Sequence, residues 1–108
     1  MLTEAEIDRI LRLIVVRTQP QKAIIFGSYA KGTATIDSDL DILVVKETDL
    51  PMARRTADLV PMLSAFLVPV DVHVFTPEEV QEYGKDEFSL VGCAFRYGRT
   101  VFQQRGRG

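Results

Sequence analysis

The sequence predicts a single α/β (α+β) domain, spanning residues 1–108, with a small mixed β-sheet and helices packed on one face of it. The chain has 108 residues, enough for one hydrophobic core but not for two. Hydrophobic residues make up 46% and charged residues 26% of it, the balance of an ordinary folded globule. Short apolar runs that suit strands alternate with segments of helical periodicity, which favours a sheet covered by helices.

The first element is an amphipathic helix over residues 3–18. Thr3 and Glu6 have the spacing of a capping box, in which each side chain bonds the backbone of the other. Apolar residues recur at helical spacing from Ile7 to Val15, and Pro20 ends the pattern.

Three later runs rich in β-branched residues are predicted to be strands: 23–26, 39–45 and 70–75. A helical turn over 28–32 and a polar loop over 32–38 separate the first two. A helix over 51–67, kinked or broken near Pro61, separates the second and third.

The last third of the chain is predicted to hold two helices and a short strand. The cap sequence beginning at Thr76 starts one helix, and the other runs from Asp86 to about Tyr97. Residues 98–102 form a closing strand, and the tail over 103–108 is expected to be frayed.

Composition narrows the class of protein. The one cysteine, Cys93, excludes an intrachain disulfide and suits a reducing compartment. The acidic, amphipathic N-terminus differs from a signal peptide, and no apolar run is long enough to span a bilayer. A net charge of −2 argues against binding nucleic acid by charge alone. We therefore expect a cytoplasmic protein with no direct nucleic-acid or membrane binding.

Two aspartates open the second predicted strand. Side chains alternate along a strand, so Asp39 and Asp41 would share one face while Leu40 and Ile42 point into the core. Such close carboxylates repel each other unless a cation lies between them, and Mg²⁺ prefers oxygen ligands. A solvated strand edge that prevents aggregation is the alternative explanation of this pair.

A glycine–serine turn precedes them. Gly27 would let backbone N–H groups approach an anion closely, with the helical turn from Ser28 directing its positive end there. If the first two strands are antiparallel, this turn and the aspartates meet at the same end of the sheet. Taken alone, Gly27 would more simply be a glycine that ends a strand.

A third carboxylate, Asp71, lies in the otherwise apolar strand over 70–75. A crossover helix over 51–67 would make this strand parallel to the second and bring Asp71 beside Asp39 and Asp41. Three convergent carboxylates are the ligands that a two-metal phosphoryl or nucleotidyl transfer site requires, with one able to take the acceptor's proton. The catalytic face of the sheet is expected to be the one left open by the helices.

Other polar side chains are expected to have ordinary structural roles. Lys31, one helical turn past Ser28, could reach a triphosphate but is more simply a solvated lysine, and His73, on the strand face of Asp71, could take part in the chemistry but more simply makes a local hydrogen bond. Arg55 is explained adequately by a charged helix face.

With these motifs in order, the chain resembles the nucleotidyltransferases of the DNA polymerase β superfamily, and within them the minimal nucleotidyltransferases (MNT proteins). The resemblance extends from the first helix to the closing strand and implies the nucleotidyltransferase fold. It also implies that Asp39, Asp41 and Asp71 are metal ligands, with Asp71 as candidate base, and that Gly27 and Ser28 hold the nucleotide's β and γ phosphates. The implied cofactor is Mg²⁺, two ions with Mn²⁺ as an alternative, and the implied substrate is ATP.

MNT proteins commonly act beside a HEPN-domain ribonuclease, so the resemblance implies an antitoxin that transfers AMP from ATP to a hydroxyl of its toxin. No segment recognisable as a grip for tRNA, primer or antibiotic is found, so the acceptor surface is expected from a partner protein or from a homo- or hetero-oligomer. Two alternatives stay open: adenylylation of a small molecule such as an aminoglycoside, and a non-catalytic antitoxin that occludes its partner.

Overall fold

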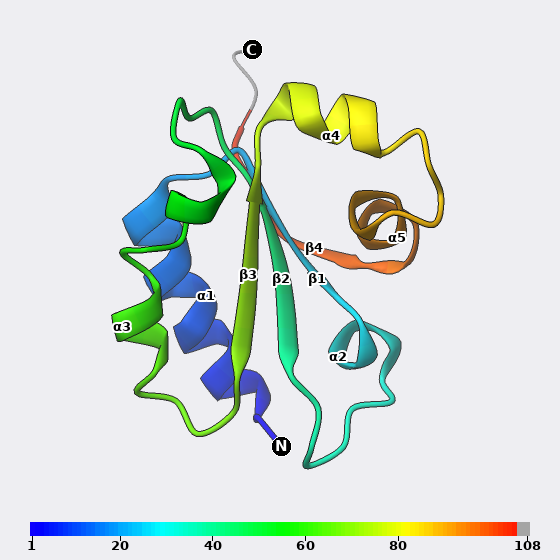
Figure 1. Ribbon diagram of the computed structural model, residues 1–108. Helices are drawn as coiled ribbons and strands as arrows, with labels where there is room; N and C mark the ends of the chain where they lie inside the picture. Colours follow the sequence, from blue (N-terminus) through cyan, green and yellow to red (C-terminus); the bar gives the residue numbers. More distant parts are fainter. Residues whose placement is uncertain (106–108) are drawn as a thin grey trace.

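A four-stranded mixed sheet forms the centre of the molecule. The computed structural model describes residues 1–105, and the strands have the spatial order β3-β2-β1-β4. They are β1 (Lys22–Phe26), β2 (Leu40–Val45), β3 (Val70–Phe75) and β4 (Arg99–Gln103). β1 is antiparallel to both β2 and β4, whereas β2 and β3 are parallel (Figure 1). The predicted fold class, a small mixed sheet with helices, is confirmed.

Helices flank the sheet on both sides. They are α1 (Glu4–Thr18), α2 (Ser28–Lys31), α3 (Val60–Leu63), α4 (Pro77–Tyr83) and α5 (Leu90–Tyr97), with a 3-10 turn η1 (Met52–Arg54). α1 begins at Thr3, whose hydroxyl accepts from the Glu6 N–H at 3.1 Å while the Glu6 carboxylate accepts from the Thr3 N–H at 2.9 Å. The predicted capping box is therefore present.

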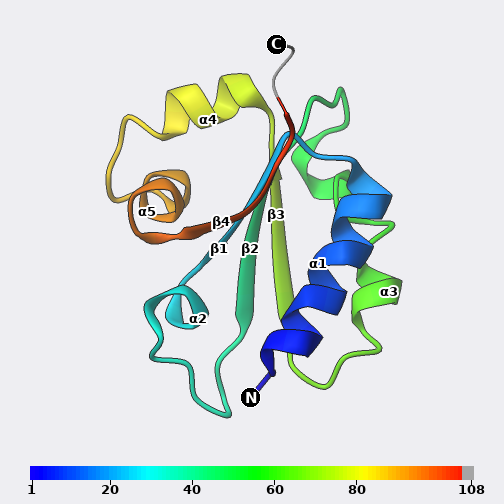
Figure 2. The same ribbon diagram turned by 180° about the vertical axis from the view of Figure 1, so that it is seen from behind.

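The larger hydrophobic core lies between the sheet and α1 and α3. Ile7, Ile10 and Ile14 of α1 pack against Leu40, Ile42 and Val44, the side chains of β2 that point to this face. Full burial of one such side chain contributes roughly 1.5–3 kcal/mol to folding. Seen from behind, α1 runs along the sheet with α3 beside it (Figure 2).

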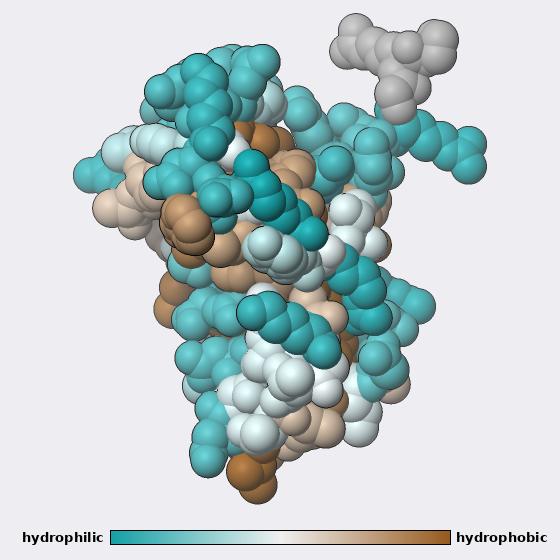
Figure 3. Space-filling view, turned by 90° about the vertical axis from the view of Figure 1, so that its right-hand side faces the viewer, coloured by the Kyte–Doolittle hydropathy of each residue, from teal (hydrophilic) through white to brown (hydrophobic). Residues whose placement is uncertain are grey.

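A second core covers part of the opposite face. Val91 and Ala94 of α5 pack against Leu43, Val45 and Phe75, which are side chains of the opposite strand parity. The expectation that helices pack on one face only is therefore corrected, because α5 presents an apolar stripe that needs burial. Viewed from this side, the outer surface is mostly hydrophilic, with hydrophobic side chains in scattered places (Figure 3).

The connection between β2 and β3 differs most from its prediction. Instead of one helix over 51–67, it contains only η1 and the single turn α3. Pro61 lacks a backbone N–H and cannot continue a helix from the preceding turn, but it fits the first turn of a new one. The break near residue 60 was expected, whereas the shortness of both pieces was not.

The C-terminal elements also shift by a few residues. α5 begins at Leu90 rather than Asp86, because the Ser89 hydroxyl caps it by accepting from the Gly92 N–H at 2.9 Å. Gln103 ends β4, and the Gln104 N–H donates to the Gln21 carbonyl at 2.8 Å. These two residues are thus held by the sheet rather than frayed; 106–108 lie outside the described residues. In residues 1–105 no helix has the length and apolar character that crossing a membrane requires.

Candidate active site

Asp41 and Asp71 are direct neighbours on adjacent strands. β2 and β3 pair in parallel with Asp41 opposite Asp71, and the Leu40 N–H donates to the Pro69 carbonyl at 3.0 Å next to them. Paired residues on neighbouring strands direct their side chains to the same face of the sheet. This is the placement that a crossover between two parallel strands predicts. It brings two carboxylates together from distant parts of the sequence.

Gly27 lies against the Asp41 carboxylate. β1 and β2 are antiparallel with Phe26 opposite Asp41, so the turn that follows Phe26 meets the start of β2. Gly27 has φ +75° and ψ −153°, a region that only glycine occupies readily. A β-carbon at this position would lie 2.6 Å from the Asp41 Oδ2 atom. The glycine is therefore required both by the backbone and by the carboxylate beside it.

The carboxyl group of Asp41 is in an unfavourable electrostatic environment. Partial burial raises its pKa, and the negative charges of Asp71 and, more weakly, Asp39 raise it further. His73 acts in the opposite direction and lowers this pKa. The site thus holds negative charge that the described side chains compensate only in part.

Asp39 approaches the pair from a loop. β2 begins at Leu40, one residue later than predicted, so Asp39 precedes the strand and is exposed. As the side chains stand, no three His, Cys, Asp or Glu residues within 1–105 are close enough together to hold a metal ion. Asp41 and Asp71 are therefore adjacent through strand pairing, whereas Asp39 affects Asp41 only through the negative charge of its carboxylate.

The glycine–serine turn leads into α2, as predicted. The Lys31 N–H donates to the Gly27 carbonyl at 3.1 Å, which closes the single helical turn. The first N–H groups of a helix have no acceptor within it and can bind an anion. Tyr29 anchors this turn, because its hydroxyl accepts from the Leu2 N–H at 3.0 Å and its ring packs against the larger core.

His73 lies beside the aspartates on the same face of β3. Its ring packs on Phe26 with the two centroids 5.9 Å apart and a tilt of 50°. Because Phe26 immediately precedes Gly27, this contact joins β3 to the turn. The sequence placed His73 on the Asp71 face, but nothing in it pointed to the contact with Phe26.

Arg55 has a structural role that the sequence did not indicate. Its side chain is only 9% exposed, and it donates to the Val74 carbonyl at 3.1 Å and to both carboxylate oxygens of Glu79. It also donates to the Leu50 carbonyl at 2.9 Å. The expectation of a charged helix face is corrected: Arg55 joins the connection after β2 to β3 and α4.

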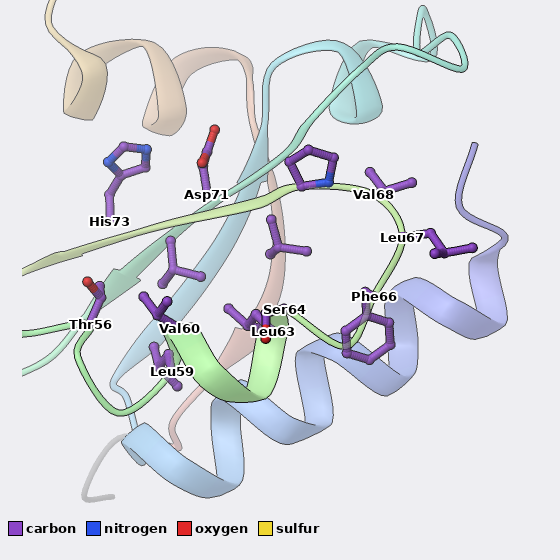
Figure 4. A pocket seen from close by; sticks show the side chains of 13 residues that line it. Thr56, Leu59, Val60, Leu63, Ser64, Phe66, Leu67, Val68, Asp71 and His73 are labelled. Atoms are coloured by element: carbon purple, nitrogen blue, oxygen red, sulfur yellow. The ribbon is translucent and has the colours of Figure 1, made fainter.

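A groove of about 450 Å³ runs along the outer edge of β3. α3 and the segment 64–69 form its far wall, and residues 70–73 form the near wall. Figure 4 shows Asp71 and His73 on the side of β3 that faces away from α3, so the groove borders the candidate site along one strand. Sequence analysis missed this groove, because it depends on how the broken connection folds back.

Comparison with known protein families gives the class of the domain. The family model of the nucleotidyltransferase domain matches residues 7–93, which include both strands with aspartates and the glycine turn. The chain belongs to the nucleotidyltransferase domain family. The resemblance inferred from the sequence is confirmed at this level, and the enzyme class is a nucleotidyltransferase.

Solved structures share the fold of this nucleotidyltransferase domain. A candidate nucleotidyltransferase from Sulfolobus solfataricus aligns with TM-score 0.62 and 18% identity, covering 91% of this chain and 78% of that one. A toxin–antitoxin complex with AMP-PNP aligns with TM-score 0.57 and 23% identity over 96% of this chain and 76% of the other. The MntA–HpeT toxin–antitoxin, in a variant with glutamate in place of two aspartates that are separated by one residue, aligns with TM-score 0.56, 21% identity and the same coverage. No curated protein matches the chain.

Proposed function

We propose that this nucleotidyltransferase transfers AMP from ATP to a hydroxyl group of a partner protein, and that it is the antitoxin of a HEPN/MNT toxin–antitoxin pair. The observation that carries the proposal is the position of Asp41, which is paired with Asp71 across two strands and packed against Gly27. A glycine turn suited to phosphate and two facing carboxylates thus share one end of the sheet.

In this proposal the residues of the site have separate roles in one displacement reaction at the α-phosphorus of ATP. Gly27 and Ser28 bind the β and γ phosphates through backbone N–H groups and the Ser28 hydroxyl. The acceptor oxygen forms a bond to the α-phosphorus of ATP, and the bond from that phosphorus to the bridging oxygen breaks, releasing pyrophosphate. Asp71, which is exposed at the edge strand, takes the proton of the acceptor hydroxyl.

The donor set fits a divalent metal ion by its chemistry. Asp39, Asp41 and Asp71 offer oxygen atoms only, the ligands that Mg²⁺ and Mn²⁺ prefer. Partial burial raises the pKa of Asp41, and the negative charges of Asp71 and Asp39 raise it further, an effect that a bound cation would offset. When bound, such ions would neutralise charge on the phosphates and on the attacking and leaving oxygens. Asp39 and Asp71 are both exposed, so their carboxylates are free to turn toward an ion.

Two comparisons support the nucleotide and the partner in this proposal. One structural neighbour is a toxin–antitoxin complex with AMP-PNP, an ATP analogue, and another is a toxin–antitoxin complex altered at two aspartates with the spacing of Asp39 and Asp41. The apolar groove beside Asp71 provides a surface for a polypeptide acceptor. We further propose that the protein works in the cytoplasm, as a complex with its toxin.

The test is a transfer assay with labelled ATP, Mg²⁺ and the HEPN-type protein encoded beside this chain's gene. We expect label on the partner with the wild type and a loss of at least about 10²-fold in rate with Asp71→Asn, if it removes the general base. Asp37→Asn is the matched control, because Asp37 is an exposed acid of the loop before β2. Label on an aminoglycoside alone would favour the small-molecule alternative, and a tight complex without transfer would favour occlusion.

A further inference from the structure

In the part of the chain that the structure describes, the open edge of β3 presents unpaired backbone groups beside Asp71. β3 is an outer strand of the sheet, and such a strand exposes N–H and C=O groups that can pair with another chain. The carbonyls of Pro69 and Phe75 accept from β2, so the odd-numbered residues direct their backbone groups inward. The groups of Val70, Val72 and Val74 therefore point to the open edge.

One contact independently confirms this direction and limits the free edge. The Val74 carbonyl meets the Arg55 guanidinium at 3.1 Å, and Arg55 comes from outside the sheet. Arg55 therefore blocks the end of this edge at Val74. Within residues 1–105, the backbone groups of Val70 and Val72, on either side of Asp71, make no hydrogen bond at this edge.

We propose that the acceptor polypeptide binds as a short antiparallel strand on this edge, and that it carries its hydroxyl residue directly opposite Asp71. This inference rests on the proposed function, since it names the form of the acceptor for that site. Residues opposite Val70 and Val72 exchange N–H and C=O bonds with them. The residue opposite Asp71 is then a non-hydrogen-bonded pair, in which the two α-carbons are only about 4.5 Å apart.

Strand parity also fixes the chemistry of the acceptor segment. Side chains opposite each other share a face, so a Ser or Thr hydroxyl opposite Asp71 reaches its carboxylate, while a Tyr hydroxyl extends further toward Asp41. The two flanking side chains point to the other face, into the groove formed by Leu59, Leu63 and Phe66. The preferred acceptor is therefore an extended segment of the order apolar–hydroxyl–apolar.

The groove supports an apolar neighbour on each side of the hydroxyl residue. Leu63 is buried, Phe66 is half-buried, and Leu67 at the end of the groove is fully exposed. A segment laid along β3 would cover part of this apolar wall. The transfer itself is the displacement described above, with the acceptor proton passing to Asp71 and pyrophosphate leaving.

The first experiment measures binding without catalysis. A blocked peptide Lys-Gln-Val-Thr-Val-Gln-Lys is titrated into the 15N-labelled protein, with Lys-Val-Gln-Thr-Gln-Val-Lys as control of identical composition but with valines on the Asp71 face. We expect hydrogen exchange of the Val70 and Val72 amides to slow at least about tenfold with the first peptide only. Slowed exchange at neither amide with saturating peptide, or equal effects of both peptides, overturns the proposal. The proposal is also overturned if these two amides already exchange slowly in the free protein and more slowly at higher protein concentration. The edge would then be paired with a second copy of the chain.

The second experiment tests the register and separates this inference from the proposed function. N-methylation of either valine of the first peptide removes a predicted hydrogen bond and should weaken its binding at least about tenfold, whereas N-methylation of the central threonine, whose N–H points away, should not. The reverse pattern overturns the antiparallel register. Transfer to the partner protein together with no peptide binding at the edge refutes strand addition alone. Peptide binding together with no transfer to any acceptor refutes the proposed function alone.

Discussion

The carboxylate of Asp41 occupies the space in which a side chain at position 27 would begin. A β-carbon on Gly27 would lie 2.6 Å from Asp41 Oδ2, well inside van der Waals contact. The turn and the carboxylate are therefore mutually dependent: the Asp41 carboxylate can lie here only because position 27 has no side chain. Substitutions at either residue should affect the other.

Gly27→Ala should be much more harmful than Gly32→Ala. Both glycines have nearly the same φ, +75° and +74°, but a β-carbon at Gly32 meets nothing within 4 Å. Gly32→Ala should cost about 1–2 kcal/mol in free energy of unfolding, for the left-handed backbone alone. Gly27→Ala should cost at least about 1 kcal/mol more, because its ψ of −153° suits glycine only and Asp41 must move. Urea denaturation of the two variants measures the difference, and equal costs would contradict the close approach.

Relative to wild type, the Asp41→Asn variant should be more stable without metal and less stable with metal and nucleotide. In EDTA the neutral amide removes the cost of partly burying a charge and the repulsion with Asp71, so the variant should be more stable than wild type, by no more than about 0.5 kcal/mol because solvent screens these charges. With Mg²⁺ and a non-hydrolysable ATP analogue at 100 times the dissociation constant, wild type should gain about 2.7 kcal/mol. The variant should gain little. Thermal unfolding under both conditions, with Asp37→Asn as control, tests the reversal; a variant less stable in EDTA would refute the repulsion.

The Arg55–Glu79 pair should stabilise the fold in a pH-dependent way. The hydrogen bond from Arg55 lowers the pKa of Glu79 below its ordinary value of 4.5. A depressed folded-state pKa means that the contribution is complete above about 4.5 and is lost as pH falls through the lower, folded value. Glu79→Gln keeps an oxygen for the cap of α4 but removes the charge. The free energy of unfolding of the wild type should exceed that of this variant by about 1–3 kcal/mol at neutral pH, and this difference should disappear in acid. A gap that is constant from pH 7 to 3 in urea titrations would show that charge is not involved.

Tyr29→Phe should loosen the chain's N-terminus from the α2 turn. The change leaves the buried Leu2 N–H without the hydroxyl that accepts its bond at 3.0 Å. We expect a loss of about 0.5–1.5 kcal/mol in urea denaturation. Tyr97→Phe is the matched control, since Tyr97 is 64% exposed on α5 and should change stability by less than about 0.5 kcal/mol.

Local patterns predicted the strands and the position of their aspartates well. Alternation along β2 placed Leu40, Ile42 and Val44 in the core, and the crossover rule for parallel strands placed Asp71 next to Asp41. The capping boxes at Thr3 and Thr76 were visible because both partners lie three residues apart. Features of this kind depend on neighbours in the sequence or on strand parity.

Long-range contacts were the features that could not be predicted. Arg55 contacts Glu79 across 24 positions, and no local pattern distinguishes such an arginine from one on a solvated helix. The same applies to α5, whose apolar stripe could be seen but not the face of the sheet that it covers. The groove beside β3 follows from the break at Pro61, and its shape depends on tertiary packing. The metal and phosphate roles of Asp39, Asp41, Asp71, Gly27 and Ser28 stay predictions.

The two ends of the described chain lie at opposite ends of the sheet, which matters for attaching labels. Gln103 pairs with Lys22, at the end of β1 remote from Phe26 and Asp41, so the chain leaves the domain far from the aspartates. Leu2, in contrast, is bonded to Tyr29, two positions after Gly27. A fluorescent protein joined on the Gln103 side of the domain should therefore leave nucleotide access unchanged, whereas one joined on the Leu2 side would crowd the glycine turn.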